Sequence, residues 1–356
     1  MIRFGLLGCG AIAKRHAEIL ASKSIGAMLN AVCDVNESRA RAFAKKYNVP
    51  AFHDITTMMQ SGTVDAVTVL TPSGLHAQHV EELARFRQVI VVEKPMALTL
   101  EAADRMVAAC DRYGARLFVV KQNRFNRPII ALKKALDNGR FGKLVMGTIR
   151  VRWCRPQSYY DADAWRGTWA YDGGVLANQA SHHIDLLEWL MGPVDSVTAI
   201  SSHALARIEA EDTAAAIMRF RNGAIGIIEA TTATRPRDLE GSLSILGERG
   251  SVVIGGFAAN ELKTWAFTEP APEDATVLQE FGNNPEHPYG FGHAAYYEHV
   301  VTCLKNNQPP LVDGSEGRKS LALITAIYES IETGREIKLH LSAKHCRLGH
   351  LSASTS

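Results

Sequence analysis

The chain has 356 residues, and its 39 Lys and Arg residues nearly balance its 37 Asp and Glu residues, which leaves a net charge of +2. At about 150 residues per domain, this length predicts two domains. A chain that is 46% hydrophobic and only 21% charged can bury two cores, so wholesale disorder is excluded. Both signs of charge are spread along the chain, and without a basic stripe we expect no nucleic-acid partner.

The sequence contains no signal for membrane insertion. The apolar start, Ile2–Leu7, is too short and too soon interrupted by glycine to be a signal peptide, and no later run reaches spanning length. The six cysteines lie far apart without a CxxC pair, which is typical of reduced thiols rather than of a disulfide framework or a zinc site. We therefore expect a cytoplasmic protein with no membrane association and no bound metal.

Short apolar runs alternate with helical segments through residue 121. The runs, rich in Val, Ile, Leu or Phe, are Arg3–Leu7, Met28–Cys33, Val64–Leu70, Val89–Val92 and Arg116–Val120. The segments with helical periodicity are Ile12–Leu20, Glu37–Tyr47, Leu75–Phe86 and Leu100–Tyr113. Strands that are apolar on both faces must be covered on both sides. The pattern therefore predicts an α/β Rossmann domain over residues 1–121, built on a doubly wound parallel sheet.

The pattern changes after Asn123. A helix at Ile129–Leu136 and a long strand at Leu144–Trp153 precede an aromatic loop and another helix. Strand-like runs with hairpin signals follow, at Val194–Ile200, Asp212–Phe220, Ala224–Thr232, Ser242–Leu246, Ser251–Ile254 and Leu262–Phe267. Asn222-Gly223 is a type I′ turn signal. After helices near His293–Leu304 and Ser315–Ile331, we expect an α+β domain over residues 122–339, with a large, mostly antiparallel open sheet, and a loosely held tail over 340–356.

The first predicted strand runs into a glycine motif that opens a helix, Gly8-Cys9-Gly10-Ala11-Ile12-Ala13. In this GxGxxA pattern, Gly8 permits a tight turn, Gly10 lets a pyrophosphate approach the backbone, and Ala13 allows the helix to pack closely. Free N–H groups at the start of the helix then bind phosphate. A plain strand–turn–helix can carry the same letters, but this one opens a βαβ unit. We expect Gly8, Gly10, Ala11, Ile12 and Ala13 to hold a dinucleotide.

The second predicted strand ends at Asp34. A carboxylate there can accept hydrogen bonds from the adenosine ribose hydroxyls, whereas a 2′-phosphate would meet like charge. As an alternative, Asp34 caps the helix that follows. Arg39, one turn further on, could tolerate a 2′-phosphate. The position therefore favours NAD over NADP.

Two further strand ends carry polar residues at the edge where open α/β sheets bind ligands, namely Thr71-Pro72-Ser73-Gly74-Leu75-His76 and Glu93-Lys94-Pro95. A lysine that is partly desolvated beside a cationic nicotinamide loses preference for its charged form, so Lys94 can shuttle a proton near neutral pH. A surface ion pair with Glu93 is the alternative. We expect the cofactor to be bordered by Thr71, Pro72, Ser73, His76, Glu93 and Lys94.

A third polar group precedes Gly192. Positions 178, 182, 185 and 189 share one face by helical spacing, and the opposite apolar face comprises Leu176, Ala180, Ile184, Leu187 and Met191. The spacing predicts that Asn178 supports His182 one turn away and that His182 can take up a proton. An ordinary packed or solvated histidine is the alternative. Zinc binding by His182 and His183 is disfavoured because adjacent helix residues point apart.

Taken together, GxGxxA, Glu93-Lys94-Pro95 and Gly173-Gly174-x3-Asn178-x3-His182-x2-Asp185 resemble the glucose-fructose oxidoreductase/inositol dehydrogenase (Gfo/Idh/MocA) family, over the chain up to about Leu339. The resemblance implies NAD(P)-dependent oxidation of sugars or polyols, with Lys94 and His182 handling the proton and the C-terminal sheet making oligomer contacts. The family usually has Asp where this chain has Asn178. Because an amide cannot relay a proton, His182 should be the weaker base, and Lys94 becomes the more important of the two proton-handling residues.

Further segments are similar to the subgroup that acts on UDP-N-acetylglucosaminuronic acid, namely Thr71–His76, Arg152–Tyr160, Trp165–Trp169, Asn178-Gln179 and Pro288–His293. That subgroup oxidises C3 of the sugar on the route to surface polysaccharides, and 2-oxoglutarate can regenerate its tightly held NAD. The resemblance implies additional cofactor contacts from Gln122, Trp165 and Arg166. It implies substrate contacts from Lys94, Arg155, Tyr160, Asn178, His182 and Tyr289.

Four arginines lie in or beside the aromatic loop, namely Arg150, Arg152, Arg155 and Arg166. Arg150 and Arg152 alternate along one strand and so share a sheet face, and arginine forks suit diphosphate and carboxylate ligands. The alternative is that these arginines pair with loop acids, namely Asp161, Asp163 or Asp172.

These features predict an NAD-dependent dehydrogenase that oxidises C3 of an acidic nucleotide sugar, UDP-N-acetylglucosaminuronic acid. One alternative is a dehydrogenase of a free sugar or cyclitol such as inositol, which needs no arginine cluster. Another is a non-catalytic, dinucleotide-sensing partner of a second protein, although the presence of both Lys94 and His182 argues against it. Because the open sheet would bury its outer face best against another copy, we expect a homodimer or homotetramer.

Overall fold

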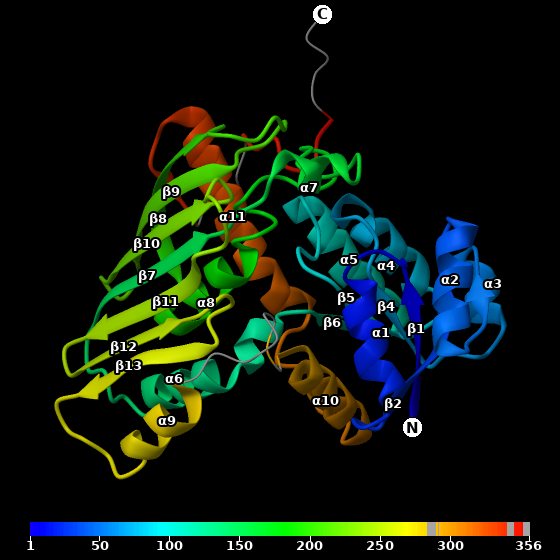
Figure 1. Ribbon diagram of the computed structural model, residues 1–356, viewed down its shortest axis with the longest axis horizontal. Coiled ribbons are helices and arrows are strands. Elements are labelled where there is room, and N and C mark those ends of the chain that lie inside the picture. Colours follow the sequence, from blue (N-terminus) through cyan, green and yellow to red (C-terminus); the bar gives the residue numbers. More distant parts are fainter. Residues whose placement is uncertain (283–289, 291, 340–344, 352–356) are drawn as a thin grey trace, which may run out of the picture. The chain divides into compact units, whose positions relative to one another are not determined.

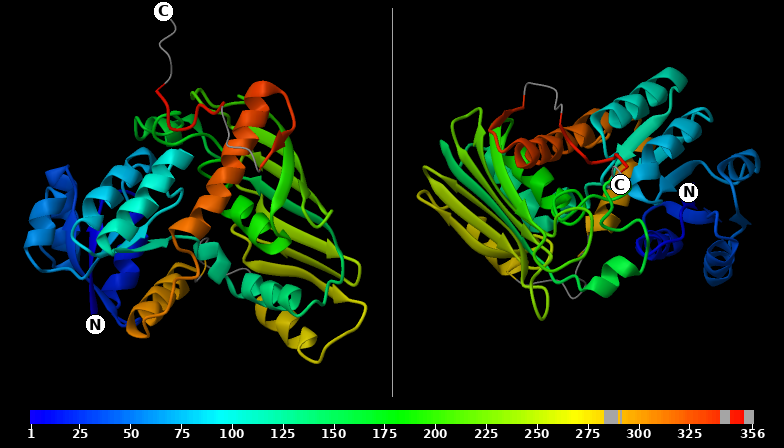
Figure 2. Two further views of the ribbon diagram at one scale, coloured as in Figure 1. Left: turned by 180° about the vertical axis from the view of Figure 1, so that it is seen from behind. Right: turned by 90° about the horizontal axis from the view of Figure 1, so that it is seen from above.

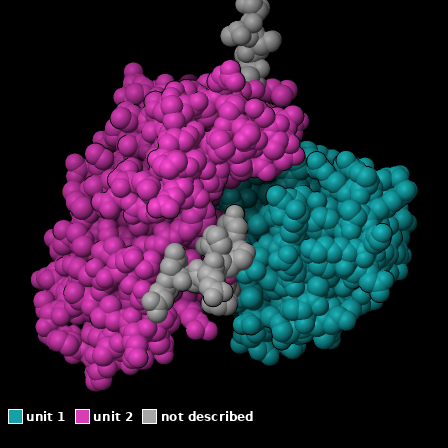
Figure 3. Space-filling model, viewed as in Figure 1, with its two compact units in different colours: residues 1–121, 293–318 teal, residues 122–292, 319–356 magenta. Residues whose placement is uncertain are grey.

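The computed structural model describes residues 1–282, 290, 292–339 and 345–351. The chain forms two compact units (Figure 3). Unit 1 contains residues 1–121 and 293–318, and unit 2 contains 122–292 and 319–356. Residues 293–318, which sequence order groups with the second domain, thus belong to the first. Helix α10 (Gly292–Lys305) carries Tyr297, whose ring packs edge-on against Phe4 in the core of unit 1.

The sheet of unit 1 has six parallel strands in the order β3-β2-β1-β4-β5-β6 (Figure 1). The strands are β1 (Ile2–Leu7), β2 (Ala27–Cys33), β3 (Ala51–Phe52), β4 (Ala66–Val69), β5 (Val89–Val92) and β6 (Arg116–Val119). The helices between them are α1 (Ala13–Ala21), α2 (Glu37–Tyr47), α3 (Ile55–Gln60), the 3₁₀ turn η1 (Ser73–Leu75), α4 (His76–Ala84) and α5 (Leu100–Tyr113). The predicted Rossmann fold is confirmed. Strand β3 and helix α3 were not expected, because a two-residue strand leaves no periodic signal.

The sheet of unit 2 has eight strands in the order β13-β12-β11-β7-β10-β9-β8-β14. They are β7 (Leu144–Arg152), β8 (Val194–Ser202), β9 (Thr213–Phe220), β10 (Ile225–Thr231), β11 (Glu240–Gly247), β12 (Gly250–Gly255), β13 (Glu261–Phe267) and β14 (Ile337–Lys338). Strands β7 and β10 pair in parallel, whereas the other neighbouring strands pair antiparallel. The predicted open, mostly antiparallel sheet is confirmed.

The helices of unit 2 are α6 (Arg127–Asp137), α7 (Gln157–Asp161), α8 (Ser181–Met191) and α9 (Asp274–Phe281), with a 3₁₀ turn, η2 (Gln122–Phe125). Helix α11 (Gly314–Thr333) belongs to unit 2 from residue 319 on. Figure 2 shows α8 and α11 on one face of the sheet. On β9, Ile217 points to the other face and is exposed. No helix in the described part of the chain is long and apolar enough to cross a membrane.

One predicted turn differs from the structure. Strands β9 and β10 form a hairpin at Asn222-Gly223, but only Gly223 has a positive φ, +87°, whereas a type I′ turn requires positive φ at both positions. The Asn222 side chain instead bridges the turn, donating to Met191 O and accepting from Ala224 N. The type I′ assignment is therefore wrong, because a side-chain hydrogen bond stabilises a different turn.

Candidate active site

The glycine loop of unit 1 joins β1 to α1. Gly8 has φ +103°, and a Cβ there would lie 2.8 Å from the backbone of Leu70, so a side chain is excluded by the neighbouring strand end. At Gly10 a Cβ would meet no protein atom within 4 Å. Ile12, at the N-cap of α1, makes no side-chain capping bond, and Ala13 is buried. The loop is therefore open where a pyrophosphate would meet the N–H groups of the helix start, and these residues fit a dinucleotide.

Asp34 links the glycine loop to the end of β2. Its Oδ2 accepts from Cys9 N at 2.7 Å, and its Oδ1 accepts from Asn36 N at 2.8 Å. The N-cap of α2 is Asn36, whose side chain accepts from the backbone N of Arg39 at 3.1 Å. The alternative role of Asp34 as the cap of this helix is therefore wrong. Each carboxylate oxygen accepts more than one hydrogen bond, so Asp34 can hold the loop and still meet a ribose hydroxyl.

His76 joins two strand-end loops of unit 1. Its Nδ1 lies 2.8 Å from Pro95 O and its Nε2 lies 2.9 Å from Thr71 O. The ring is fully buried, and desolvation lowers its pKa. Pro72 and Ser73 lie in the same loop, at the N-cap and first residue of η1. His76 therefore brings the segment after β4 and the segment after β5 together.

Glu93 turns inward from the end of β5. Its Oε2 accepts from Lys94 N at 2.9 Å, and its Oε1 lies 3.1 Å from Nε2 of the buried His16. Burial by itself would raise the pKa of Glu93, but hydrogen bonds from His16 and His293 hold this pKa well below its usual range. Because Glu93 is buried, the alternative of a surface ion pair between Glu93 and Lys94 is wrong. Lys94 is partly buried and is followed by a cis peptide bond to Pro95.

In unit 2, Asn178 does not lie on the helix that carries His182. Helix α8 begins at Ser181, and Asn178 lies in the turn before it, where its Nδ2 donates to Asp172 Oδ1 at 2.5 Å. The buried Asp172 also accepts from Gly167 N at 2.8 Å. The predicted placement of Asn178 one helical turn before His182 is therefore wrong. Helical spacing was extrapolated through a turn that begins at Gly173, with φ +81°.

The imidazole of His182 is held by a residue from η2. Nε2 of His182 lies 3.0 Å from the side-chain nitrogen of Gln122. Two residues on, Arg124 forms a buried two-point ion pair with Asp185, at 2.7 and 2.8 Å, and lies over the Trp189 ring. Thus η2 fixes α8 at two positions one turn apart. Arg124 was not identified from the sequence, although its spacing from Gln122 directly after a strand was a usable signal.

Helix α8 is buried on more than one side, with Ser181–Leu187, Leu190 and Met191 all inside. His183 is fully buried against Trp153, and desolvation lowers its pKa to about 4, which is typical of a core histidine. Among the described residues, the group close enough to hold a metal ion is in unit 1: His16, Glu93 and His293.

The loop arginines have carboxylate partners. Arg152 pairs with Glu229 at 2.5 Å and with Glu240 at 3.0 Å, and Arg150 lies 3.7 Å from Glu229. Arg166 pairs with Asp163 at 3.2 Å, as the pairing alternative predicted. The partners of Arg150 and Arg152 come from β10 and β11, because these strands flank β7 in the sheet.

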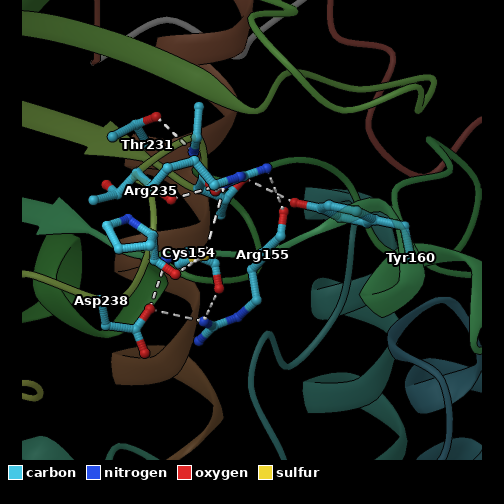
Figure 4. Close-up of polar contacts among 10 residues, drawn as sticks. Cys154, Arg155, Tyr160, Thr231, Arg235 and Asp238 are labelled. Atoms are coloured by element: carbon cyan, nitrogen blue, oxygen red, sulfur yellow. Dashed lines mark hydrogen bonds and ion pairs between the residues drawn. The ribbon is translucent and has the colours of Figure 1, made fainter.

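Arg155 and Tyr160 belong to one group of polar contacts around Cys154 and Arg235 (Figure 4). Arg155 Nη1 donates to Cys154 O at 2.7 Å and to Asp238 Oδ1 at 3.0 Å. The Tyr160 hydroxyl lies 2.8 Å from Thr232 Oγ1, and burial raises its pKa to about 12. A cavity of about 500 Å³ in unit 2 is lined by Tyr160, Arg166, Gln157, Asp161, Arg207 and Glu209.

The remaining expected contact residues are placed as follows. Trp165 lies beside Arg166, whose guanidinium is 5.1 Å from the centre of its ring. Tyr289 lies outside the described residues.

One residue in the described part of the tail is buried. Leu348 is 1% exposed and lies against the turn at Gly173, and Arg347 covers the ring of Trp169. Leu348 is therefore held against unit 2, whereas Leu351 is exposed. One leucine in a polar segment gives no periodic signal, so this contact required the tertiary structure.

Comparison with known proteins agrees with this architecture. Residues 2–121 match a family model described as "Oxidoreductase family, NAD-binding Rossmann fold", and residues 133–339 match "Oxidoreductase family, C-terminal alpha/beta domain". The WlbA dehydrogenase from Bordetella pertussis, solved with NADH and UDP-GlcNAcA, is 46% identical, with a TM-score of 0.88 over 96% of this chain and 99% of that one.

The WlbA dehydrogenase from Chromobacterium violaceum, also solved with NADH and UDP-GlcNAcA, is 41% identical, with a TM-score of 0.90 over 97% of both chains. A curated relative, the myo-inositol 2-dehydrogenase of Thermotoga maritima, is 29% identical over 95% of this chain and 98% of its own length.

Proposed function

The chain belongs to the Gfo/Idh/MocA oxidoreductase family and is an NAD-dependent sugar or cyclitol dehydrogenase, and from this premise we propose that it oxidises C3 of UDP-N-acetylglucosaminuronic acid. The observation that carries the proposal is the similarity, over nearly the full chain, to two structures that hold this nucleotide sugar. The identity to both exceeds that to the inositol dehydrogenase. Since the relatives are dehydrogenases, the non-catalytic alternative is set aside.

In this proposal the glycine loop and Asp34 hold the cofactor. The N–H groups at the start of α1 bind the pyrophosphate, and the space over Gly10 admits it. The carboxylate of Asp34 accepts from the adenosine ribose hydroxyls and disfavours a 2′-phosphate. When bound, NAD accepts a hydride from the sugar carbon.

The proton of the oxidised hydroxyl passes to this chain's own residues. We assign Lys94 as the group that takes the proton and His182 as the second proton-handling group. Gln122 can orient either form of His182, because an amide offers an N–H donor on one side and an oxygen acceptor on the other. Asn178, which donates to Asp172, contributes a polar contact and no proton relay.

Guanidinium groups are the expected partners of the carboxylate and diphosphate of the proposed substrate. Arg155 is held by Asp238 and the backbone, which orients its fork. A guanidinium has five N–H donors, so an arginine that is fixed by one carboxylate can still meet a substrate carboxylate or phosphate. Tyr160, Arg166, Trp165 and Tyr289 remain proposed contacts to substrate or cofactor.

The decisive experiment is incubation of the protein with NAD and UDP-N-acetylglucosaminuronic acid, with and without 2-oxoglutarate, followed by mass analysis. We expect the nucleotide sugar to lose two hydrogens, and 2-oxoglutarate to sustain turnover as the oxidant that regenerates the cofactor. Turnover of free sugars with no change in the nucleotide sugar would reject the substrate. The cyclitol alternative is favoured by the curated inositol relatives, so myo-inositol is the matched competitor.

A further inference from the structure

A chain of buried polar side chains lies behind Lys94 in unit 1. Its members come from four separate segments and are less than a tenth exposed, namely Thr68 on β4, His16 on α1, Glu93 after β5, and His293 and Tyr297 on α10. Burying polar groups is favourable only when each finds a partner, so the direction of every hydrogen bond matters here.

The directions are mutually consistent. The backbone N–H of Lys94 can only donate, so Glu93 Oε2 accepts it at 2.9 Å. On the other side Glu93 Oε1 lies 3.1 Å from His16 Nε2, which must donate to an ionised carboxylate. In the neutral tautomer of His16 that carries its proton on Nε2, Nδ1 is an acceptor and the hydroxyl of Tyr297, 2.8 Å away, donates to it. Thr68 Oγ1, 3.0 Å from that hydroxyl, completes the chain as donor.

A carboxylate accepts at both ends of this chain while Nε2 of His16 donates. Glu93 accepts on Oε1 and on Oε2, whereas a glutamine would present N–H groups to a donor on one of the two sides. Nε2 of His293 lies 3.8 Å from Oε1 and adds a second ring on the same side. The negative charge is therefore fixed directly beside the backbone of Lys94.

From this geometry we infer that His16, Glu93 and Tyr297 form a positioning network for Lys94, which sets the direction of the lysine backbone and places a fixed negative charge next to it. The inference rests on the proposed role of Lys94 as proton acceptor. Tyr297 lies on helix α10, far along the chain from Lys94, so this helix helps to position the reacting group.

Several charged or titratable groups face Glu93 and its partners. They are Arg15 and His16 on α1, His76 on α4, and His293, Tyr296 and Tyr297 on α10. Burial lowers the pKa of His293 and raises that of Tyr297, so at neutral pH the network contains a neutral His293, an un-ionised tyrosine and one anion. Removing that anion disfavours the protonated form of a neighbouring amine.

The test uses two variants of the full-length protein and one matched control. Tyr297→Phe removes only the hydroxyl that orients His16, and Glu93→Gln removes the charge and one acceptor. The control is Tyr47→Phe, in the same unit, because the Tyr47 hydroxyl has no hydrogen-bond partner among the residues described. Steady-state kinetics over a pH series, NADH affinity, and hydrogen exchange at the Lys94 amide are measured for all three.

We expect kcat to fall about fivefold in Tyr297→Phe, the equivalent of one hydrogen bond, and about a hundredfold in Glu93→Gln, as misplacement of a reacting group produces. NADH affinity and KM should stay within about twofold, because the cofactor loop is untouched. The acid limb of the pH–kcat profile should move to lower pH in Glu93→Gln. The Lys94 amide should exchange its hydrogen faster in both variants, and its exchange rate should be unchanged in Tyr47→Phe.

Unaltered kcat, pH profile and Lys94 exchange in Glu93→Gln would overturn the inference. So would a stoichiometric metal ion in the purified wild-type protein that is lost in Glu93→Gln, since His16, Glu93 and His293 would then be its ligands. Failure of the proposed function is distinguishable: the wild type would turn over no nucleotide sugar, while Lys94 amide exchange, which needs no substrate, still reports on the network.

Discussion

The proposed site residues of unit 1 and unit 2 are held by different means. In unit 1 the glycine loop, the segment at Thr71 and the segment at Lys94 all follow parallel strands, so their places come from the sheet itself. In unit 2, Asn178 lies in a turn and is held by Asp172 of the same loop, whereas His182 lies on a buried helix and is held by Gln122 from a distant segment. Sheet topology positions the proposed site residues of unit 1, and individual polar contacts position those of unit 2.

The largest effect that we predict for a residue of unit 1 is at Lys94. Lys94→Ala should lower kcat by about a thousandfold, because a general base contributes roughly 10²–10⁴ in rate, while NAD remains bound. Turnover and NADH fluorescence titration check the two parts. Lys45→Ala on the exposed end of α2 is the control. If the Lys94 variant turned over at the wild-type rate, Lys94 would not be the proton acceptor.

In unit 2, the Arg124–Asp185 pair should carry stability. Asp185→Asn leaves a guanidinium buried without its anion and should reduce the free energy of unfolding by about 3–5 kcal/mol. Replacing both residues together, as Arg124→Met with Asp185→Leu, should recover most of the loss, since no buried charge remains. Denaturant unfolding of the wild type and the two variants measures this. Equal losses in the single and double variants would contradict a mainly electrostatic penalty.

Glu211 provides a pH test of the same region. It accepts from Leu176 N and from the Tyr328 hydroxyl, and burial raises its pKa to about 7. A carboxyl with a raised folded-state pKa stabilises the protein fully below its unfolded pKa of about 4.3, and this contribution is lost as pH rises towards 7. Wild type should therefore lose roughly 3 kcal/mol relative to Glu211→Gln between these pH values. Parallel unfolding curves at pH 4.5 and pH 8 decide it.

Asp34→Ala tests whether the residue that follows β2 sets the preference for NAD over NADP. NAD affinity should fall about tenfold, by the loss of charge-assisted hydrogen bonds to ribose, and NADP should become relatively better bound. Titration with both reduced cofactors measures the ratio. Asn36→Ala, at the cap of α2, is a control for general loosening of the segment. An unchanged ratio would assign Asp34 to loop structure alone.

The smallest effect concerns the outer face of the sheet in unit 2. Ile200 and Ile217 are 72% and 62% exposed there, and an open apolar sheet face is best covered by a second copy. Ile217→Asp should shift a proposed dimer or tetramer towards smaller species without changing the fold. Light scattering measures the mass, and a wild-type monomer would reject the assembly.

Much of the fold followed from sequence periodicity. The bounds of α2, α5 and β5 are those expected, because hydrophobic spacing and local signals such as Asn36 and Thr99 at helix N-caps act within a few residues. The turn before α8 was missed because its shape depends on Asp172 and Glu211, which lie outside any helical repeat. The packing of Leu348 against that turn was missed for the same reason.

The sequence by itself determined the parallel and antiparallel sheets, the glycine loop, and which residue types stand at the strand ends, because these are properties of short-range pattern. Only the tertiary structure decided that Gln122 meets His182, that Arg155 pairs with Asp238 instead of a loop acid, and that Tyr297 meets His16. These pairings join residues tens to hundreds of positions apart. No local spacing encodes them, and burial makes each one matter, since a buried polar group must find a partner wherever the fold supplies it.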